Sequence, residues 1–160
     1  MSQTGIEVEI EVPGWTQALP AADMLTRAAA EAALAQVERS GGVVVLLTDD
    51  EAVAALNRDF RGKVGPTNVL SFPAAANPEQ HLGDIALALG VCAREADEQG
   101  KSLAHHLQHL VAHGVLHLVG FDHQTDSEAE EMEALERRIL QGLGVADPYA
   151  GEDQGQGQHG

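Results

Sequence analysis

The sequence predicts a single α/β (or α+β) domain in which a small, mixed four-stranded sheet packs against about five helices. The length of 160 residues suits one domain with one hydrophobic core. Hydrophobic residues make up 44% of the chain and charged residues 21%, which is typical of a folded globular protein. Segments with strand-like and helix-like periodicity follow one another along the chain, an order that places one sheet beside several helices.

Four segments have the patterns of β-strands. Residues 6–12 alternate apolar and acidic side chains, as a half-buried strand does. Residues 43–47 are apolar throughout, which predicts a strand covered on both faces. Residues 68–72 and 84–89 indicate two further strands, and the segment 61–67, which contains two glycines and a proline, is expected to be a loop.

Five segments have the patterns of helices. They are expected at 21–39, after Thr48, at 91–99, at 102–119 and from Ser127 to about Leu143. The first is rich in alanine, and its buried face is expected to carry Leu25, Ala28, Ala32 and Ala35. The fourth has an apolar stripe and ends at Gly120.

Two of these helices begin with a capping-box pattern, in which a hydroxyl side chain and an acid three residues later satisfy the first backbone N–H groups. The pairs are Thr48 with Glu51 and Ser127 with Glu130. In the helix after Thr48, the apolar side chains at helical spacing, including Phe60, are expected to point into the core.

Composition excludes several classes of protein. No apolar stretch approaches the roughly 20 residues that cross a bilayer, and the first residues lack the pattern of a secretion signal, so we expect a cytoplasmic protein without membrane contact. Cys92 is the only cysteine, which excludes an internal disulfide and a cysteine-based metal site. Residues 1–146 are expected to form the domain, and residues 147–160, rich in Gly, Gln and acid, a disordered tail.

One basic window interrupts an acidic chain. The formal net charge of −16 argues against broad, non-specific binding of nucleic acid. Within residues 56–76, however, the only charged side chains are Arg58, Asp59, Arg61 and Lys63, so this window carries +2 and the rest of the chain −18. Arg61 could be an ordinary solvated charge in a turn, but its place in this window favours binding of phosphate by its planar guanidinium.

The histidines give the clearest chemical signal. His113 and His117 are four residues apart in a predicted helix, so both imidazoles can reach one ion. Gly120 can adopt the left-handed conformation that ends a helix, which would let the chain fold back and supply His123 as a third ligand. Three protein ligands leave one position open, as catalytic zinc sites do. We therefore expect one Zn²⁺ per chain.

Three nearby residues have more than one interpretation. His109, one turn earlier, could line the pocket, orient a ligand or be an ordinary helical histidine. Asp84 could be a polar residue at a sheet edge or an acid behind the metal. The histidine spacing matches the metzincin proteases, but their general base would stand at Gly114. A glycine inside a helix costs about 1 kcal/mol relative to alanine, so Gly114 is expected to serve a close approach of backbone or substrate.

Three sequence runs together resemble the YbeY family of bacterial endoribonucleases. They are H-G-V-L-H-L-V-G-F-D-H, R-G-K-V-G-P-T-N-V-L-S-F-P and L-G-D-I, and the resemblance covers about residues 46–143. It implies a small mixed sheet with helices on it, zinc bound by His113, His117 and His123, and catalysis by Arg61, to which we add His113 as a catalytic residue. Phe121 stands where the family usually has tyrosine.

The same resemblance implies a function in ribosome maturation. The preferred reading is a zinc-dependent, single-strand-specific endoribonuclease that acts in maturation of small-subunit ribosomal RNA and in ribosome quality control. Its expected partners are single-stranded or ribosomal RNA, the small ribosomal subunit with its proteins, and a ribosome-associated GTPase. Two alternatives stay open, a ribosome assembly factor with a mainly structural zinc and a metzincin-like metalloprotease. Asp122 and Asp84 are the candidate proton carriers.

Overall fold

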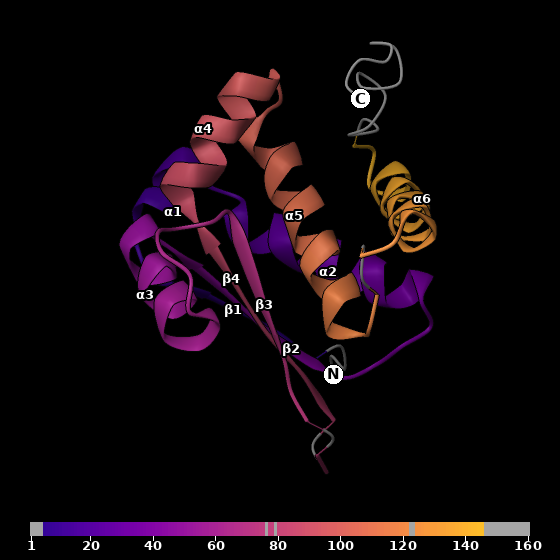
Figure 1. The fold of residues 1–160 in the computed structure, drawn as a ribbon. Coiled ribbons are helices and arrows are strands. Elements are labelled where there is room, and N and C mark those ends of the chain that lie inside the picture. Colours follow the sequence, from indigo (N-terminus) through magenta and orange to yellow (C-terminus); the bar gives the residue numbers. More distant parts are fainter. Residues whose placement is uncertain (1–4, 76, 79, 122–123, 146–160) are drawn as a thin grey trace.

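The computed structural model describes residues 5–75, 77–78, 80–121 and 124–145, and Figure 1 shows the arrangement of its elements. The strands are β1 (Ile6–Ile10), β2 (Gly42–Thr48), β3 (Val69–Pro73) and β4 (His81–Ala88). The helices are α1 (Gly14–Ala18), α2 (Ala22–Gln36), α3 (Asp50–Arg61), α4 (Leu89–Gln99), α5 (Leu103–Leu118) and α6 (Asp126–Gly142). The predicted class, one small α/β domain, is confirmed. The predicted tail, residues 147–160, lies outside the described residues.

The four strands form one mixed sheet in the order β1-β2-β4-β3. β1 runs parallel to β2 and β2 parallel to β4, whereas β3 is antiparallel to β4 and forms an edge of the sheet. Ser71 on β3 pairs with Ile85 on β4, so these two side chains share one face, and Phe72 pairs with Asp84 on the other. The two faces of β3 therefore contact different helices.

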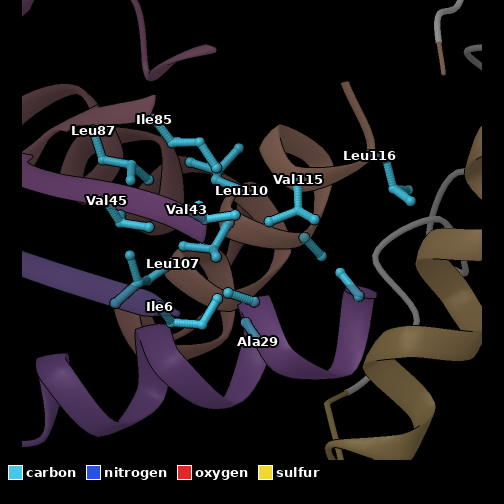
Figure 2. Packing of buried hydrophobic residues seen from close by; sticks show 14 of the residues in the cluster. Ile6, Ala29, Val43, Val45, Ile85, Leu87, Leu107, Leu110, Val115 and Leu116 are labelled. Carbon is cyan, nitrogen blue, oxygen red and sulfur yellow. The ribbon is translucent and has the colours of Figure 1, made fainter. Parts of the chain in front are cut away.

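The sheet is covered on both sides, by α2 and α5 on one face and by α3 and α4 on the other, with α6 packed outside α2 and α5 (Figure 1). Figure 2 shows the larger core, in which Val43, Val45 and Ile85 of the strands meet Leu107 and Leu110 of α5. A smaller cluster on the other face is formed by Val53, Leu70, Ala86 and Ala88. Because both faces are covered, the central strand β2 is apolar on both sides from Val43 to Leu47. Burial of each Val, Leu or Ile side chain stabilises the domain by about 1.5–3 kcal/mol.

One helix was not predicted. α1 follows β1 closely, and its N-cap residue is Pro13, just beyond the strand that was predicted at residues 6–12. Its Trp15 is fully buried and donates a hydrogen bond from Nε1 to the carbonyl oxygen of Thr48 at 2.8 Å. Proline is tolerated at a helix start because the N–H that it lacks would have no intrahelical partner there. The described part of the chain thus contains six helices rather than about five.

Two expectations about helix faces were wrong. Phe60 is 69% exposed rather than part of the core. In α2 the fully buried residues include Ala29, Ala30 and Ala33, whereas Ala35 is exposed. The buried face of this helix therefore differs from the predicted one. A helix rich in alanine offers little contrast in hydrophobicity between its faces, and tertiary packing then decides which side is buried.

Neither predicted capping box is formed by the residues that we expected. Thr48 belongs to β2, and Asp49 caps α3 by accepting a hydrogen bond from the backbone N–H of Ala52 at 2.8 Å. The capping box of α6 is formed by Thr125 and Glu128 rather than by Ser127 and Glu130. Each helix starts, as expected, with a side-chain oxygen that accepts a hydrogen bond from a backbone N–H. Several residues that can cap stand close together at each start, and the sequence pattern did not identify the one that does. Within the described ranges, no helix has the length and apolarity of a membrane span.

Candidate active site

A cleft of about 740 Å³ lies between the end of α3, the edge strand β3 and the C-terminal half of α5. Arg61, His113 and His117 all line it, although the arginine and the histidines come from distant parts of the sequence. Other lining residues come from these elements, such as Asn57 and Ser71, and from the segments between and after them, such as Lys63, Asn68 and Phe121. Arg61 is the last residue of α3 and not, as predicted, the first of a loop.

Gly114 lets α5 approach the sheet at the turn that carries the histidines. A Cβ atom at this position would lie 3.1 Å from two carbon atoms of Ile85 and 3.1 Å from Oγ of Ser71. The hydroxyl of Ser71 instead donates a hydrogen bond to the carbonyl oxygen of Gly114 at 3.2 Å. The expected reason for this glycine, close backbone approach, is confirmed, and the glutamate of a metzincin would crowd Ile85 and Ser71 at this position.

The two histidines point their Nε2 atoms at one another. These atoms are 3.1 Å apart, and the rings meet edge to face with centroids 4.6 Å apart. Zinc binds imidazole nitrogens at about 2.0–2.1 Å in tetrahedral geometry, which places two such nitrogens about 3.3 Å from each other. The spacing between His113 and His117 therefore fits two ligands of one zinc ion.

Glu136 fixes the orientation of His113, and the sequence analysis missed it. Its carboxylate is 1% exposed and accepts hydrogen bonds from Nδ1 of His113 at 2.7 Å and from Nε2 of His109 at 2.8 Å. Donation through Nδ1 leaves the lone pair of a neutral His113 on Nε2, which faces His117. His109 thus lies behind the site, held by the same carboxylate, and does not line the cleft.

The electrostatics of Glu136 agree with this role. Burial raises the pKa of its carboxyl group, but the hydrogen bonds from His109 and His113 lower it by more, to about 2. Glu136 is therefore ionised at neutral pH, and an ionised carboxylate is the strongest acceptor for a ring N–H. The signal in the sequence was an acid on the apolar stripe of α6, where Met132, Ile139 and Leu140 are its buried neighbours.

The end of α5 has the turn that the sequence predicted. Gly120 has a φ of +103°, its N–H donates to the carbonyl oxygen of His117 at 3.1 Å, and the N–H of Phe121 donates to that of Leu116 at 3.0 Å. This pair of hydrogen bonds is a Schellman motif, which reverses the chain after a helix. The predicted third ligand, His123, and Asp122 lie outside the described residues. Among those that are described, no group of three or more His, Cys, Asp or Glu side chains is placed to hold a metal ion.

Polar side chains hold the loop after Arg61 in place at both ends. The buried Asn57 donates a hydrogen bond to the carbonyl oxygen of Gly65 at 2.9 Å. At the other end, Asn68 donates to Glu95 of α4 at 2.9 Å. Within the described ranges neither Arg61 nor Lys63 forms an ion pair with a carboxylate. Both positive charges therefore stand at the cleft ready for an anionic ligand.

Asp84 does not belong to this site. Its neighbour Ile85 faces α5, so Asp84 points to the opposite face of the sheet. There its carboxylate accepts a hydrogen bond from Nε2 of His81 at 2.7 Å. The interpretation of Asp84 as an acid behind the metal was therefore wrong. The alternative, a polar residue at a sheet edge, was wrong as well, because β4 is an inner strand and Asp84 pairs with Val44 on one side and with Phe72 on the other.

Together the fold and the cleft define a class: a small α/β protein in which a closely spaced histidine pair and an arginine line the same cleft. Comparison with known proteins gives the family. A family model described as "Endoribonuclease YbeY" matches residues 14–144. Endoribonuclease YbeY of Maricaulis maris is 52% identical over 155 residues, covering 96% of this chain and 97% of the relative. That of Azorhizobium caulinodans is 53% identical over 153 residues, covering 91% and 96%.

The chain therefore belongs to the endoribonuclease YbeY family, as its sequence motifs predicted. A solved structure supports the fold. The solution structure of TM1509 from Thermotoga maritima matches with a TM-score of 0.56 at 24% identity, covering 86% of this chain and 91% of that one.

Proposed function

We propose that this protein is a zinc-dependent endoribonuclease that cuts single-stranded RNA and acts in the maturation of small-subunit ribosomal RNA and in ribosome quality control. The observation that carries the proposal is that Arg61 lines the same cleft as the histidine pair. A nuclease needs a cation for the phosphate beside the group that activates the nucleophile, and the cleft holds Arg61 together with the histidine pair that would bind such a group. Relatives that share about half of its residues are named endoribonucleases.

The residues that would hold the zinc ion are His113, His117 and His123. The Nε2 spacing of the first two and the buried Glu136 behind His113 support this assignment. Bound zinc would supply Lewis-acid chemistry, which polarises phosphoryl oxygens and lowers the pKa of water. Glu136 keeps the ring of His113 in one tautomer and one orientation, which is its contribution to the proposed catalytic centre.

Arg61 would bind the scissile phosphate. Cleavage of a phosphodiester builds negative charge on the nonbridging oxygens, and a guanidinium aimed at them stabilises the transition state more than the ground state. The loop fixed by Asn57 and Asn68 holds Lys63 at the same cleft, where it adds attraction for the RNA backbone. An acidic chain with one basic cleft would thus bind RNA at one place.

The metalloprotease alternative loses support from the structure. The base of such an enzyme would stand at position 114, where a side chain would meet Ile85 and Ser71. The test below distinguishes the proposed nuclease from the other alternative, a ribosome assembly factor with a mainly structural zinc. The small ribosomal subunit with its proteins, a ribosome-associated GTPase and a cytoplasmic location belong to the proposal, because the family points to ribosome maturation.

The test compares cleavage of single-stranded RNA by wild type, Arg61→Ala and Arg61→Lys at equal zinc content. Loss of one such electrostatic donor costs about 10²–10³ in rate, so Arg61→Ala should lose nearly all cleavage while its melting temperature is unchanged. Lys should restore activity only in part, because a point charge cannot copy the two-pronged contact of a guanidinium. Arg94→Ala removes an exposed arginine of α4 that pairs with Asp50 and serves as the charge-matched control.

Two results would contradict the proposal. Cleavage by Arg61→Ala at the wild-type rate would remove the catalytic role of Arg61. If cleavage by this variant disappears in vitro while cells that carry it mature their ribosomal RNA normally, the assembly-factor alternative is favoured.

A further inference from the structure

One exposed aromatic side chain is the sequence neighbour of a residue that lines the cleft. Phe60 directly precedes Arg61, and 69% of it is exposed. The chain has only five Phe, Trp and Tyr residues: three Phe, one Trp and one Tyr. Phe60 is therefore one of few aromatic side chains that this protein could offer to a ligand. Across the described ranges, the exposed large hydrophobic residues are Met24, Phe60 and Val64, the last 98% exposed. Two of the three therefore stand on either side of the cationic Arg61 and Lys63.

The ring of Phe60 is held in place. It packs edge to face against Phe72, with centroids 5.7 Å apart and an angle of 68° between the rings. Phe72 belongs to the edge strand β3, where it points to the face opposite Ser71, the face that α3 covers. Edge-to-face contact is a preferred geometry of aromatic pairs, and it fixes the ring while most of its surface stays open to solvent.

Charge indicates which ligand fits this surface. The window 56–76 carries +2 while the rest of the chain carries −18. A polyanion is repelled by most of this protein and attracted to the surface around Arg61 and Lys63. An aromatic side chain beside backbone-binding cations is the combination that binds single-stranded nucleic acid, since bases stack on the ring while phosphates contact the cations.

We propose that Phe60 is a stacking platform for one unpaired base of the RNA, in a nucleotide next to the phosphate that Arg61 binds. The inference rests on the proposed nuclease function and deepens it, because a base stacked between its neighbours in a duplex cannot reach such a ring. The platform would therefore be one source of selectivity for single strands.

The test measures binding of a fluorescein-labelled single-stranded RNA and of a hairpin RNA of the same composition. Removal of a stacking ring weakens binding by about 5- to 150-fold. We expect Phe60→Ala to lose this much affinity for the single strand, to lose little for the hairpin stem, and to keep its zinc content. Phe60→Trp should bind at least as well as wild type. Phe60→Leu keeps an apolar contact with Phe72 but has no aromatic face, so it should bind as poorly as Phe60→Ala.

Met24→Ala is the matched control, since it removes an exposed apolar side chain from α2, 65% exposed and outside the cleft. A second measurement locates the base. A single abasic nucleotide, moved along the RNA, should weaken binding to wild type at one position and have no effect at that position with Phe60→Ala.

If Phe60→Ala or Phe60→Leu binds every RNA within twofold of Met24→Ala, the stacking platform is refuted while the proposed nuclease stands. If wild type neither binds nor cuts single-stranded RNA, the proposed function itself fails and the inference with it.

Discussion

Replacement of Glu136 by glutamine tests the link between the buried carboxylate and the histidine site. Glutamine has nearly the same shape but no charge, and one of its two terminal groups is an NH₂ donor. Since Glu136 accepts from both His109 and His113, the amide must place a donor against one ring N–H or force that ring to change its tautomer. Either outcome disturbs the orientation of His113.

Two magnitudes follow from the structure. Loss of a carboxylate that orients a metal-binding histidine costs about 10- to 100-fold in metal affinity, or about 1.4–2.8 kcal/mol. A carboxyl group with a pKa of about 2, in place of its ordinary 4.5, contributes on the order of 3 kcal/mol to the stability of the zinc-free fold at neutral pH. Part of this remains in Glu136→Gln as neutral hydrogen bonding, so we expect a loss of about 1–3 kcal/mol.

The sign of the pH dependence is fixed by the lowered pKa of Glu136. The stabilisation of the fold by ionised Glu136 is fully present above pH 4.5 and disappears as the pH falls toward 2. In this range Glu136 is protonated in the unfolded chain but still ionised in the folded protein, so acid favours unfolding. The stability of zinc-free wild type and of zinc-free Glu136→Gln should therefore differ at pH 7, and the difference should shrink below pH 4.5 and be lost only near pH 2.

The assays are zinc competition against a chelating dye and urea unfolding of the zinc-free proteins at several pH values. Glu131→Gln, on the exposed side of the same helix, is the control. If Glu136→Gln binds zinc as tightly as Glu131→Gln and unfolds at the same urea concentration, Glu136 does not support the site.

Three further predictions concern the ligands, the tail and the packing of α5. His117→Ala should lose most of its zinc after dialysis, as measured by elemental analysis; zinc content equal to that of wild type would mean that the site is misassigned. Truncation after Ala146 should leave the melting temperature and zinc content unchanged, because residues 147–160 contain almost no apolar side chain, whereas a drop of several degrees would mean that they dock on the domain. Gly114→Glu should lower the free energy of unfolding by about 1–3 kcal/mol or more in urea titrations and create no peptidase activity, since its Cβ would crowd Ile85 and Ser71; a stable and proteolytic variant would refute this reading.

Features set by local sequence were predicted well. The strand at β2, the helical stripe of α5 and the turn at Gly120 depend on periodicity and on the conformational freedom of one residue. The spacing of His113 and His117 depends only on helix geometry, so their shared face also followed from the sequence.

Features set by tertiary packing were not predicted. Glu136 meets His113 only because α6 packs against α5, and no local pattern pairs these two residues. The exposure of Phe60 depends on how α3 rotates on the sheet, which its apolar spacing alone did not determine. The charge environment of Arg61 was visible in the sequence, but its place in the same cleft as the histidines depends on the fold.

The measurement that tests the central claim most directly is the rate of single-stranded RNA cleavage as a function of zinc bound per chain. Zinc is removed with a chelator and returned in steps, and metal content and cleavage rate are determined on the same samples. The account predicts that the rate rises in proportion to bound zinc, reaches its plateau at one ion per chain, and stays near zero throughout for Arg61→Ala. Full cleavage by the zinc-free protein, or none by the fully loaded protein, would contradict it.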